Sequence, residues 1–126
     1  MKVVSTASSP SAIGPYSQAI TVNGLIYTSG QIPLDPKTMT IVGEGSAPDQ
    51  ARQCLENLKA VLEAGGSDLD NAIKLTVFIK NMDDFGKINE VYSEYFSKHK
   101  PARSCVEVAR LPKDVLVEIE AIALLK

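Results

Sequence analysis

The sequence predicts an α+β fold in which one sheet carries two helices on one face. Expected elements follow one another in the order β-β-β-α-β-α-β-β over residues 1–126, a length that predicts one domain. Apolar residues alternate in the expected strands and recur at helical spacing in the two expected helices. Two helices can cover one face of a sheet, so we expect the other face to lack cover within the chain.

The first three expected elements are strands. Residues 2–5 can form a short strand, and 17–22 and 25–31 flank Asn23-Gly24. That dipeptide is typical of a tight hairpin because both positions tolerate positive φ. The hairpin ends near Gly30, where a missing side chain often marks the close approach of a ligand.

The first helix is expected after a long connection over 32–47. Ser46 can cap it, Pro48 suits its first turn, and Gly65-Gly66 can end it. Its apolar residues recur at helical spacing and consist of Ala51, Cys54, Leu55, Leu58, Val61 and Leu62.

A strand over 72–80 and a second helix over 82–97 follow. The strand alternates, which predicts that Ile73, Leu75, Val77 and Ile79 point inward. Asn81 is the expected N-cap of the helix. The apolar stripe of the helix consists of Phe85, Ile88, Tyr92, Tyr95 and Phe96, with Asn89 beside it.

The last quarter of the chain, 101–124, is its most apolar part and predicts a hairpin with a turn at 111–114. Arg103, Cys105, Glu118 and Glu120 lie within it, and a buried charge without a partner costs several kcal/mol. These groups therefore satisfy one another or bind a charged small molecule. Their arrangement depends on register, because a slip of one residue moves Arg103 and Cys105 to the face opposite the glutamates.

Composition excludes several classes of protein. A net charge of −2 and a pI near 5.4, with scattered lysines and arginines, argue against a nucleic-acid surface. We expect a cytoplasmic protein without a membrane span, because no apolar run suits a signal peptide or a spanning helix. Cys54 and Cys105 are then expected to be reduced thiols. One histidine, His99, and no CxxC or HxxxH spacing predict no metal site.

The expected bare face of the sheet predicts self-association. Packing on another copy of the chain would remove its apolar residues from water. Those available to this face are Phe78, Leu116, Ile122 and Leu124.

Arg103 is the strongest candidate for chemistry, because a guanidinium in an apolar strand matches a carboxylate in a bidentate pair. The alternative is an ion pair with Glu107, Glu118 or Glu120 in the same hairpin.

Glu118 and Glu120 are the second candidate. Two close carboxylates raise each other's pKa, which suits a group that takes a proton from water. The alternative is that one neutralises Arg103 and the other faces solvent.

Other candidates have weaker support. Cys105 and Ser29 lack a positioned base and are therefore poor candidates for a nucleophile. We interpret Cys105 as a residue that lines the pocket and contributes its backbone N–H. Tyr16, in a rigid loop after Gly14-Pro15, either closes a pocket or anchors that loop. Asn89 either satisfies a backbone group or contacts a ligand.

Several segments together carry a family resemblance: IGPYSQ at 13–18, TSGQIP at 28–33, PARSCVEV at 101–108, LPK at 111–113 and VEIEA at 117–121. With these motifs the chain resembles the RidA family, also called YjgF-type, of reactive intermediate deaminases. The resemblance covers the whole length. It is strongest to the archetypal deaminating subgroup, which carries an arginine in the PARS segment followed by the EIEA strand.

The resemblance implies a chorismate-mutase-like fold assembled as a homotrimer, with sheets inside, helices outside and clefts between subunits. It implies hydrolysis of 2-imino acids and their enamine tautomers, such as 2-iminopropanoate and 2-iminobutanoate, to 2-keto acids and ammonia. Pyridoxal-phosphate-dependent serine and threonine dehydratases supply these imines, whereas the deaminase itself needs no cofactor.

The resemblance also implies roles for individual residues. Arg103 binds the substrate carboxylate, and Glu118 orients and activates the attacking water. Gly30 and Cys105 present backbone N–H groups. The other residues that line the cleft are Tyr16, Ser29 and Asn89. One departure is Lys100, because many members carry an aromatic residue before the proline, so the resemblance does not predict the shape of the pocket mouth.

Two rival functions remain from other classes. One is a regulatory trimer that senses keto acids or amino acids without turnover, which an arginine-anchored pocket also fits. The other is a ribonuclease or translation inhibitor. The acidic charge and the lack of paired histidines or a basic groove count against the second.

Overall fold

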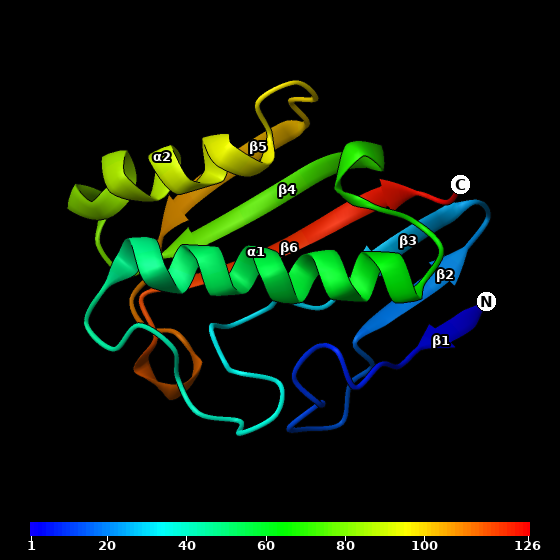
Figure 1. Ribbon diagram of the computed structural model, residues 1–126, viewed down its shortest axis with the longest axis horizontal. Helices are drawn as coiled ribbons and strands as arrows, with labels where there is room; N and C mark the ends of the chain where they lie inside the picture. The colour runs from blue at the N-terminus through cyan, green and yellow to red at the C-terminus, as the bar shows by residue number, and fades with distance from the viewer.

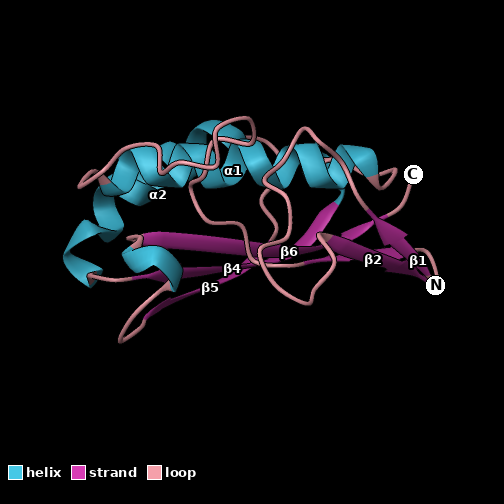
Figure 2. Cartoon of the chain, turned by 90° about the horizontal axis from the view of Figure 1, so that it is seen from below, coloured by secondary structure: helices cyan, strands magenta, loops and turns pink.

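Six strands form one sheet, and two α-helices pack on the same face of it (Figures 1 and 2). The structure is a computed structural model that describes residues 1–126. Its elements are β1 (Lys2–Val4), β2 (Ala19–Val22), β3 (Leu25–Thr28), α1 (Ala47–Ala64), β4 (Ala72–Ile79), α2 (Phe85–Tyr95), β5 (Ala102–Glu107) and β6 (Val117–Leu124). The predicted α+β class, element order and placement of the helices are confirmed.

The N-terminal strands form the predicted hairpin. Val22 pairs with Leu25 across the turn, and φ is 51° at Asn23 and 78° at Gly24. These left-handed values are the ones that a two-residue hairpin turn requires. β3 ends at Thr28, earlier than predicted. Beyond it Gln31 forms a single bridge with Ile119 of β6.

α1 forms as predicted and supplies much of the core. The hydroxyl oxygen of Ser46 accepts a hydrogen bond from the N–H of Asp49 at 3.4 Å, and Gly66 follows the helix with φ 88°. The predicted apolar stripe is fully buried against the sheet. Neither α1 nor α2 is both long and apolar enough to cross a membrane.

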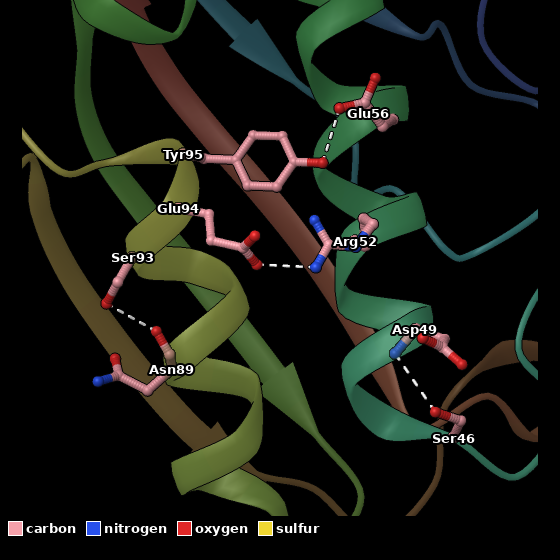
Figure 3. Close-up of polar contacts among 8 residues, drawn as sticks. All are labelled: Ser46, Asp49, Arg52, Glu56, Asn89, Ser93, Glu94 and Tyr95. Atoms are coloured by element: carbon pink, nitrogen blue, oxygen red, sulfur yellow. Dashed lines mark hydrogen bonds and ion pairs between the residues drawn. The ribbon is translucent and has the colours of Figure 1, made fainter.

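α2 starts later than predicted because residues 82–84 form a 3₁₀ turn. Polar contacts then join it to α1 (Figure 3). Arg52 forms an ion pair with Glu94 at 2.7 Å, and the hydroxyl of Tyr95 donates to Glu56 at 2.7 Å. The ion pair is exposed, so it contributes little to the stability of the fold.

The predicted hairpin over 101–124 is wrong. β4 lies between the two strands, pairing parallel with β5 and antiparallel with β6, so β5 forms the edge of the sheet (Figure 1). The connection between β5 and β6 is too long for a hairpin turn and passes the end of β4. Lys80 holds it there, with its N–H donating to the carbonyl of Leu116 at 3.0 Å and its Nζ to that of Ala109 at 2.8 Å.

The inward direction predicted for Ile73 is also wrong. Its side chain is 41% exposed, whereas Ala72 is buried. The pairing of β4 with β6 shifts between Ala72 and Lys74, and this bulge turns Ile73 outward. Leu75, Val77 and Ile79 lie beyond the bulge and point inward as predicted.

The face of the sheet opposite the helices, called the bare face below, carries no helix (Figure 2). Val3, Tyr27 and Leu124 are 67%, 42% and 50% exposed there. Phe78, Leu116 and Ile122, which were expected on this face, are partly buried. Self-association through this face stays a prediction.

Candidate active site

The sheet separates the predicted site residues into two groups. Directly paired residues point to the same face of a sheet. Arg103 pairs with Leu75, which pairs with Ala121, and both of these are buried under the helices. Glu118 pairs with Phe78 of β4, one step out of phase, so its side chain belongs to the opposite face. Arg103 therefore lies on the face opposite the two glutamates, and the intervening strand β4 sets this arrangement instead of a direct hairpin register.

Arg103 belongs to β5, and its guanidinium lies against α2 without an acidic partner. Its Nη1 donates to Oδ1 of Asn89 at 2.7 Å, and its guanidinium lies 4.7 Å from the ring centre of Tyr92 and 5.4 Å from that of Phe85. The chain has three ion pairs, and none involves Arg103. The alternative in which Arg103 forms an ion pair with Glu107, Glu118 or Glu120 is therefore not found.

Arg103 lies at the surface of the chain, although its segment is among the most apolar in the sequence. β5 is an edge strand, and Arg103 is exposed. Its guanidinium is held in place by an amide and two aromatic rings, while its remaining N–H groups stay free. This arrangement suits recognition of a carboxylate.

Asn89 supports the guanidinium from α2. Its side chain extends from the helix on the side away from α1 (Figure 3). Its oxygen accepts from Arg103, and its Nδ2 has no hydrogen-bond partner in the chain. The sequence alternative in which this amide satisfies a backbone group is not found.

Cys105 lies two residues after Arg103 and on the same face of β5. Burial raises the pKa of its thiol more than the nearby Arg103 lowers it. A thiol of this kind is a poor nucleophile. Val108 donates to Ile79 of β4, so alternation along the edge strand turns the N–H of Cys105 outward. This geometry fits both roles expected of Cys105, namely that it lines the pocket and that it presents its backbone N–H to a ligand.

The second group lines a cavity of about 370 Å³ at the other face. Four of the predicted site residues meet there: Tyr16, Ser29, Gly30 and Glu118. Three apolar residues that the sequence did not single out complete the lining, namely Ile13, Ile32 and Pro112. They belong to the motif segments, but no charge or periodicity distinguishes them from ordinary loop residues.

Glu118 is the only ionisable carboxylate of this cavity. Its oxygens accept no hydrogen bond and form no ion pair within the chain. Burial raises its pKa, and the neighbouring Glu120 raises it further. A carboxylate in this state is suited to accept a proton from water.

Two predicted residues are held firmly by backbone groups. The hydroxyl of Ser29 donates to the carbonyl of Ser17 at 2.6 Å, and the hydroxyl oxygen of Tyr16 accepts from the N–H of Ile13 at 3.4 Å. Gln18, buried next to them, was missed by the sequence analysis. Its Nε2 donates to the carbonyl of Pro10 at 2.8 Å, and its Oε1 accepts from the N–H of Thr6 at 2.7 Å. It fixes the loop that carries Tyr16.

Gly30 touches the carboxylate of Glu118, because a Cβ added at Gly30 would collide with that side chain. The N–H of Gly30 has no hydrogen-bond partner in the chain, so it is free to bind a ligand. No three His, Cys, Asp or Glu side chains lie close enough together to hold a metal ion.

We expect Gly30→Ala to lower kcat of any reaction that uses Glu118 by roughly 10- to 100-fold, because displacing a catalytic group by about 1 Å has an effect of this size. The backbone of Gly30 does not have positive φ, so alanine fits its conformation. Steady-state kinetics and urea unfolding measure the two effects separately. Gly86→Ala on exposed α2 is the control, since a Cβ there meets nothing. Wild-type kcat in Gly30→Ala would show that the contact with Glu118 is unimportant.

Comparison with known proteins adds a family match. Residues 6–125 match the family described as Endoribonuclease L-PSP. A RutC family protein of Synechocystis is 56% identical over 99% of this chain and 97% of its own. The 2-iminobutanoate/2-iminopropanoate deaminase of Salmonella typhimurium is 52% identical over 97% of this chain and 96% of its own.

Other relatives carry other names. A Lactococcus lactis protein described as a regulator, AldR, is 52% identical over 100% of this chain and 99% of its own. Among solved structures, Escherichia coli TdcF with bound serine superposes with a TM-score of 0.94 at 49% identity, covering 100% of both chains.

Proposed function

The chain belongs to the Endoribonuclease L-PSP family, which includes the YjgF and RidA proteins, and from this membership we propose that it hydrolyses reactive 2-imino acids to 2-keto acids and ammonia. Relatives of about half-identical sequence named as 2-iminobutanoate/2-iminopropanoate deaminases support this activity. The proposed substrates are 2-iminopropanoate, 2-iminobutanoate and their enamine tautomers. No cofactor takes part in the proposed reaction.

One observation carries the proposal. The chain holds an unneutralised guanidinium, Arg103, at one face of the sheet and an unpaired carboxylate of raised pKa, Glu118, at the other. A 2-imino acid needs both groups: a cation for its carboxylate and a base for the water that attacks its imine carbon.

The two groups meet when a second subunit contributes one of them. We propose a homotrimer in which each cleft between subunits joins the Arg103 side of one chain to the Glu118 side of its neighbour. The bare face supports this assembly, because packing it on another copy would remove its exposed apolar side chains from water.

The proposed reaction begins with the substrate carboxylate on the fork of Arg103. Glu118 accepts a proton from water as the oxygen bonds to the imine carbon, and the imine nitrogen takes a proton from solvent. Protonated Glu118 then gives its proton to the amino group of the carbinolamine, which leaves as ammonia. The hydroxyl proton returns to solvent as the C=O bond of the keto acid forms. Free N–H groups of Gly30 and Cys105 are available to hold the substrate or the attacking water. Tyr16, Ser29 and Asn89 line the cleft.

A coupled assay tests this activity. A serine or threonine dehydratase generates the imine, and keto-acid formation is followed with and without the protein. We expect faster keto-acid formation with the protein present. An unchanged rate across a wide range of protein concentrations would contradict the proposal.

A ligand-sensing regulator is the second candidate. The relative named as regulator AldR and the serine bound in TdcF favour it. It predicts saturable binding of keto acids or amino acids with no acceleration of imine loss. A ribonuclease has less support, because the Nε2 atom of the only histidine, His99, lies 2.6 Å from the carbonyl oxygen of Ala72.

A further inference from the structure

We propose that the cavity beside Arg103 also accepts a second carboxylate, so that the protein acts on imines of dicarboxylic amino acids, with Lys100 as the residue that selects them. This inference rests on the proposed deaminase function and extends its substrate class. The same hydrolysis then applies, with C=N replaced by C=O and ammonia released.

The cavity lies between α2 and the start of β5 and has a volume of about 340 Å³. It contains two cations, Lys100 and Arg103, and no acidic side chain. Its lining residues are Asn89, Tyr92, Ser93, Phe96, Lys100, Pro101 and Arg103. Neither cation takes part in an ion pair within the chain. Two unneutralised cations at one cavity attract a ligand with two negative charges more strongly than a ligand with one.

The cavity also offers hydrogen-bond donors that the chain does not use. Nδ2 of Asn89 has no partner, and Nη1 is the only guanidinium nitrogen of Arg103 that donates within the chain. Tyr92 is 7% exposed, and its hydroxyl is the one buried side-chain polar atom without a hydrogen-bond partner. Most buried side-chain polar atoms in folded proteins have a hydrogen-bond partner, so this unpaired hydroxyl is unusual. A cavity with several free donors is suited to an anion that brings several acceptors.

The other half of the site directs the second carboxylate to this cavity. The cavity around Glu118 contains a carboxylate and no cation, so it repels a further negative charge. If the first carboxylate lies on Arg103 and the imine carbon faces Glu118, the second carboxylate of a dicarboxylic substrate can pair with Lys100, the other cation of this cavity. Its ammonium on a flexible stem can follow substrates of different length.

Binding of two stable keto acids tests the proposal on the full-length protein. 2-Ketoglutarate has a second carboxylate and 2-ketobutyrate does not, and calorimetry gives a Kd for each. We expect 2-ketoglutarate to bind wild type at least about tenfold more tightly than 2-ketobutyrate, which corresponds to about 1.4 kcal/mol. The preference should weaken at high salt, because Lys100 is exposed.

Lys100→Met is the test variant, and Lys98→Met is its control. Both remove one positive charge from the same segment, but Lys98 does not line the cavity. We expect Lys100→Met to remove the preference for 2-ketoglutarate while 2-ketobutyrate binds within about twofold of wild type, an effect within the usual range of a surface change. Lys98→Met should keep the preference.

Turnover separates this inference from the proposed deaminase function. If wild type hydrolyses 2-iminopropanoate but shows no preference for the dicarboxylic ligand, or keeps that preference in Lys100→Met, the role of Lys100 is overturned and the deaminase stands. If wild type hydrolyses no imine, the deaminase proposal fails, and the binding data alone decide whether the cavity selects dicarboxylates.

Discussion

Arg103→Ala is expected to lower kcat/KM for 2-iminopropanoate by roughly 10²- to 10³-fold, which is the effect of removing one partner of a desolvated charge pair. The substrate has few atoms besides its carboxylate, so little else can hold it near the water. Part of the effect should appear in KM and part in kcat, because the same contact binds the substrate and orients the imine carbon.

Arg103→Lys separates charge from shape. It keeps the positive charge but loses the planar fork and the stacking on Tyr92, so we expect activity between wild type and Arg103→Ala. Arg110→Ala is the control, because Arg110 is exposed and pairs only with Asp114. Turnover in Arg103→Ala equal to that of Arg110→Ala would remove Arg103 from the mechanism.

Glu118→Gln is expected to lower kcat by roughly 10²- to 10⁴-fold, the usual contribution of a general base. Glutamine keeps the size of the side chain but accepts no proton at neutral pH. Because Glu118 forms no hydrogen bond or ion pair within the chain, the fold should lose little stability. Urea unfolding checks this, and a wild-type kcat in a stably folded variant would contradict the assignment.

The pH profile gives an independent test of Glu118. Its ionised form is the active one, so activity should fall as pH drops through its pKa, which burial and Glu120 raise above the ordinary value for a glutamate. Glu120→Gln removes a like charge and lowers that pKa, so the acid limb should move to lower pH. An unchanged acid limb in Glu120→Gln would show that the two carboxylates do not interact.

Local signals in the sequence predicted the elements well because each depends on near neighbours in the chain. Asn23-Gly24 specifies a tight turn wherever it lies between two strands, and Ser46 caps the helix that follows it. The same signals failed at Ile73, where a bulge imposed by the partner strand reverses the direction of the side chain. No pattern within 72–80 reveals such a bulge.

The order of the strands in the sheet was harder to predict from the sequence than the residues that form each strand. Residues 101–124 contain two alternating segments, and alternation does not specify which strand lies between them. β4 separates them because its residues Leu75, Val77 and Ile79 continue the buried surface of β6. Without that hairpin, the alternative in which Arg103 pairs with a glutamate of the same hairpin is also lost.

The sequence predicted which side chains form the candidate site, but it did not predict that they lie on two opposite faces of the sheet. Arg103 and Glu118 stand out because charges are rare in apolar strands. That they lie at opposite faces depends on the strand between them. The role of Gln18 was hidden because a buried amide gives no periodic signal.

Mixed oligomers test most directly whether one site takes Arg103 from one subunit and Glu118 from another. Arg103→Ala and Glu118→Gln chains are co-expressed with different tags, and doubly tagged oligomers are purified and assayed. In a trimer that contains both kinds of chain, one of the three interfaces joins a wild-type Arg103 to a wild-type Glu118, so about one third of the sites are intact. We predict that the mixture recovers about that fraction of wild-type activity, although each variant alone is nearly inactive. Activity no higher than that of the separate variants would contradict the shared site.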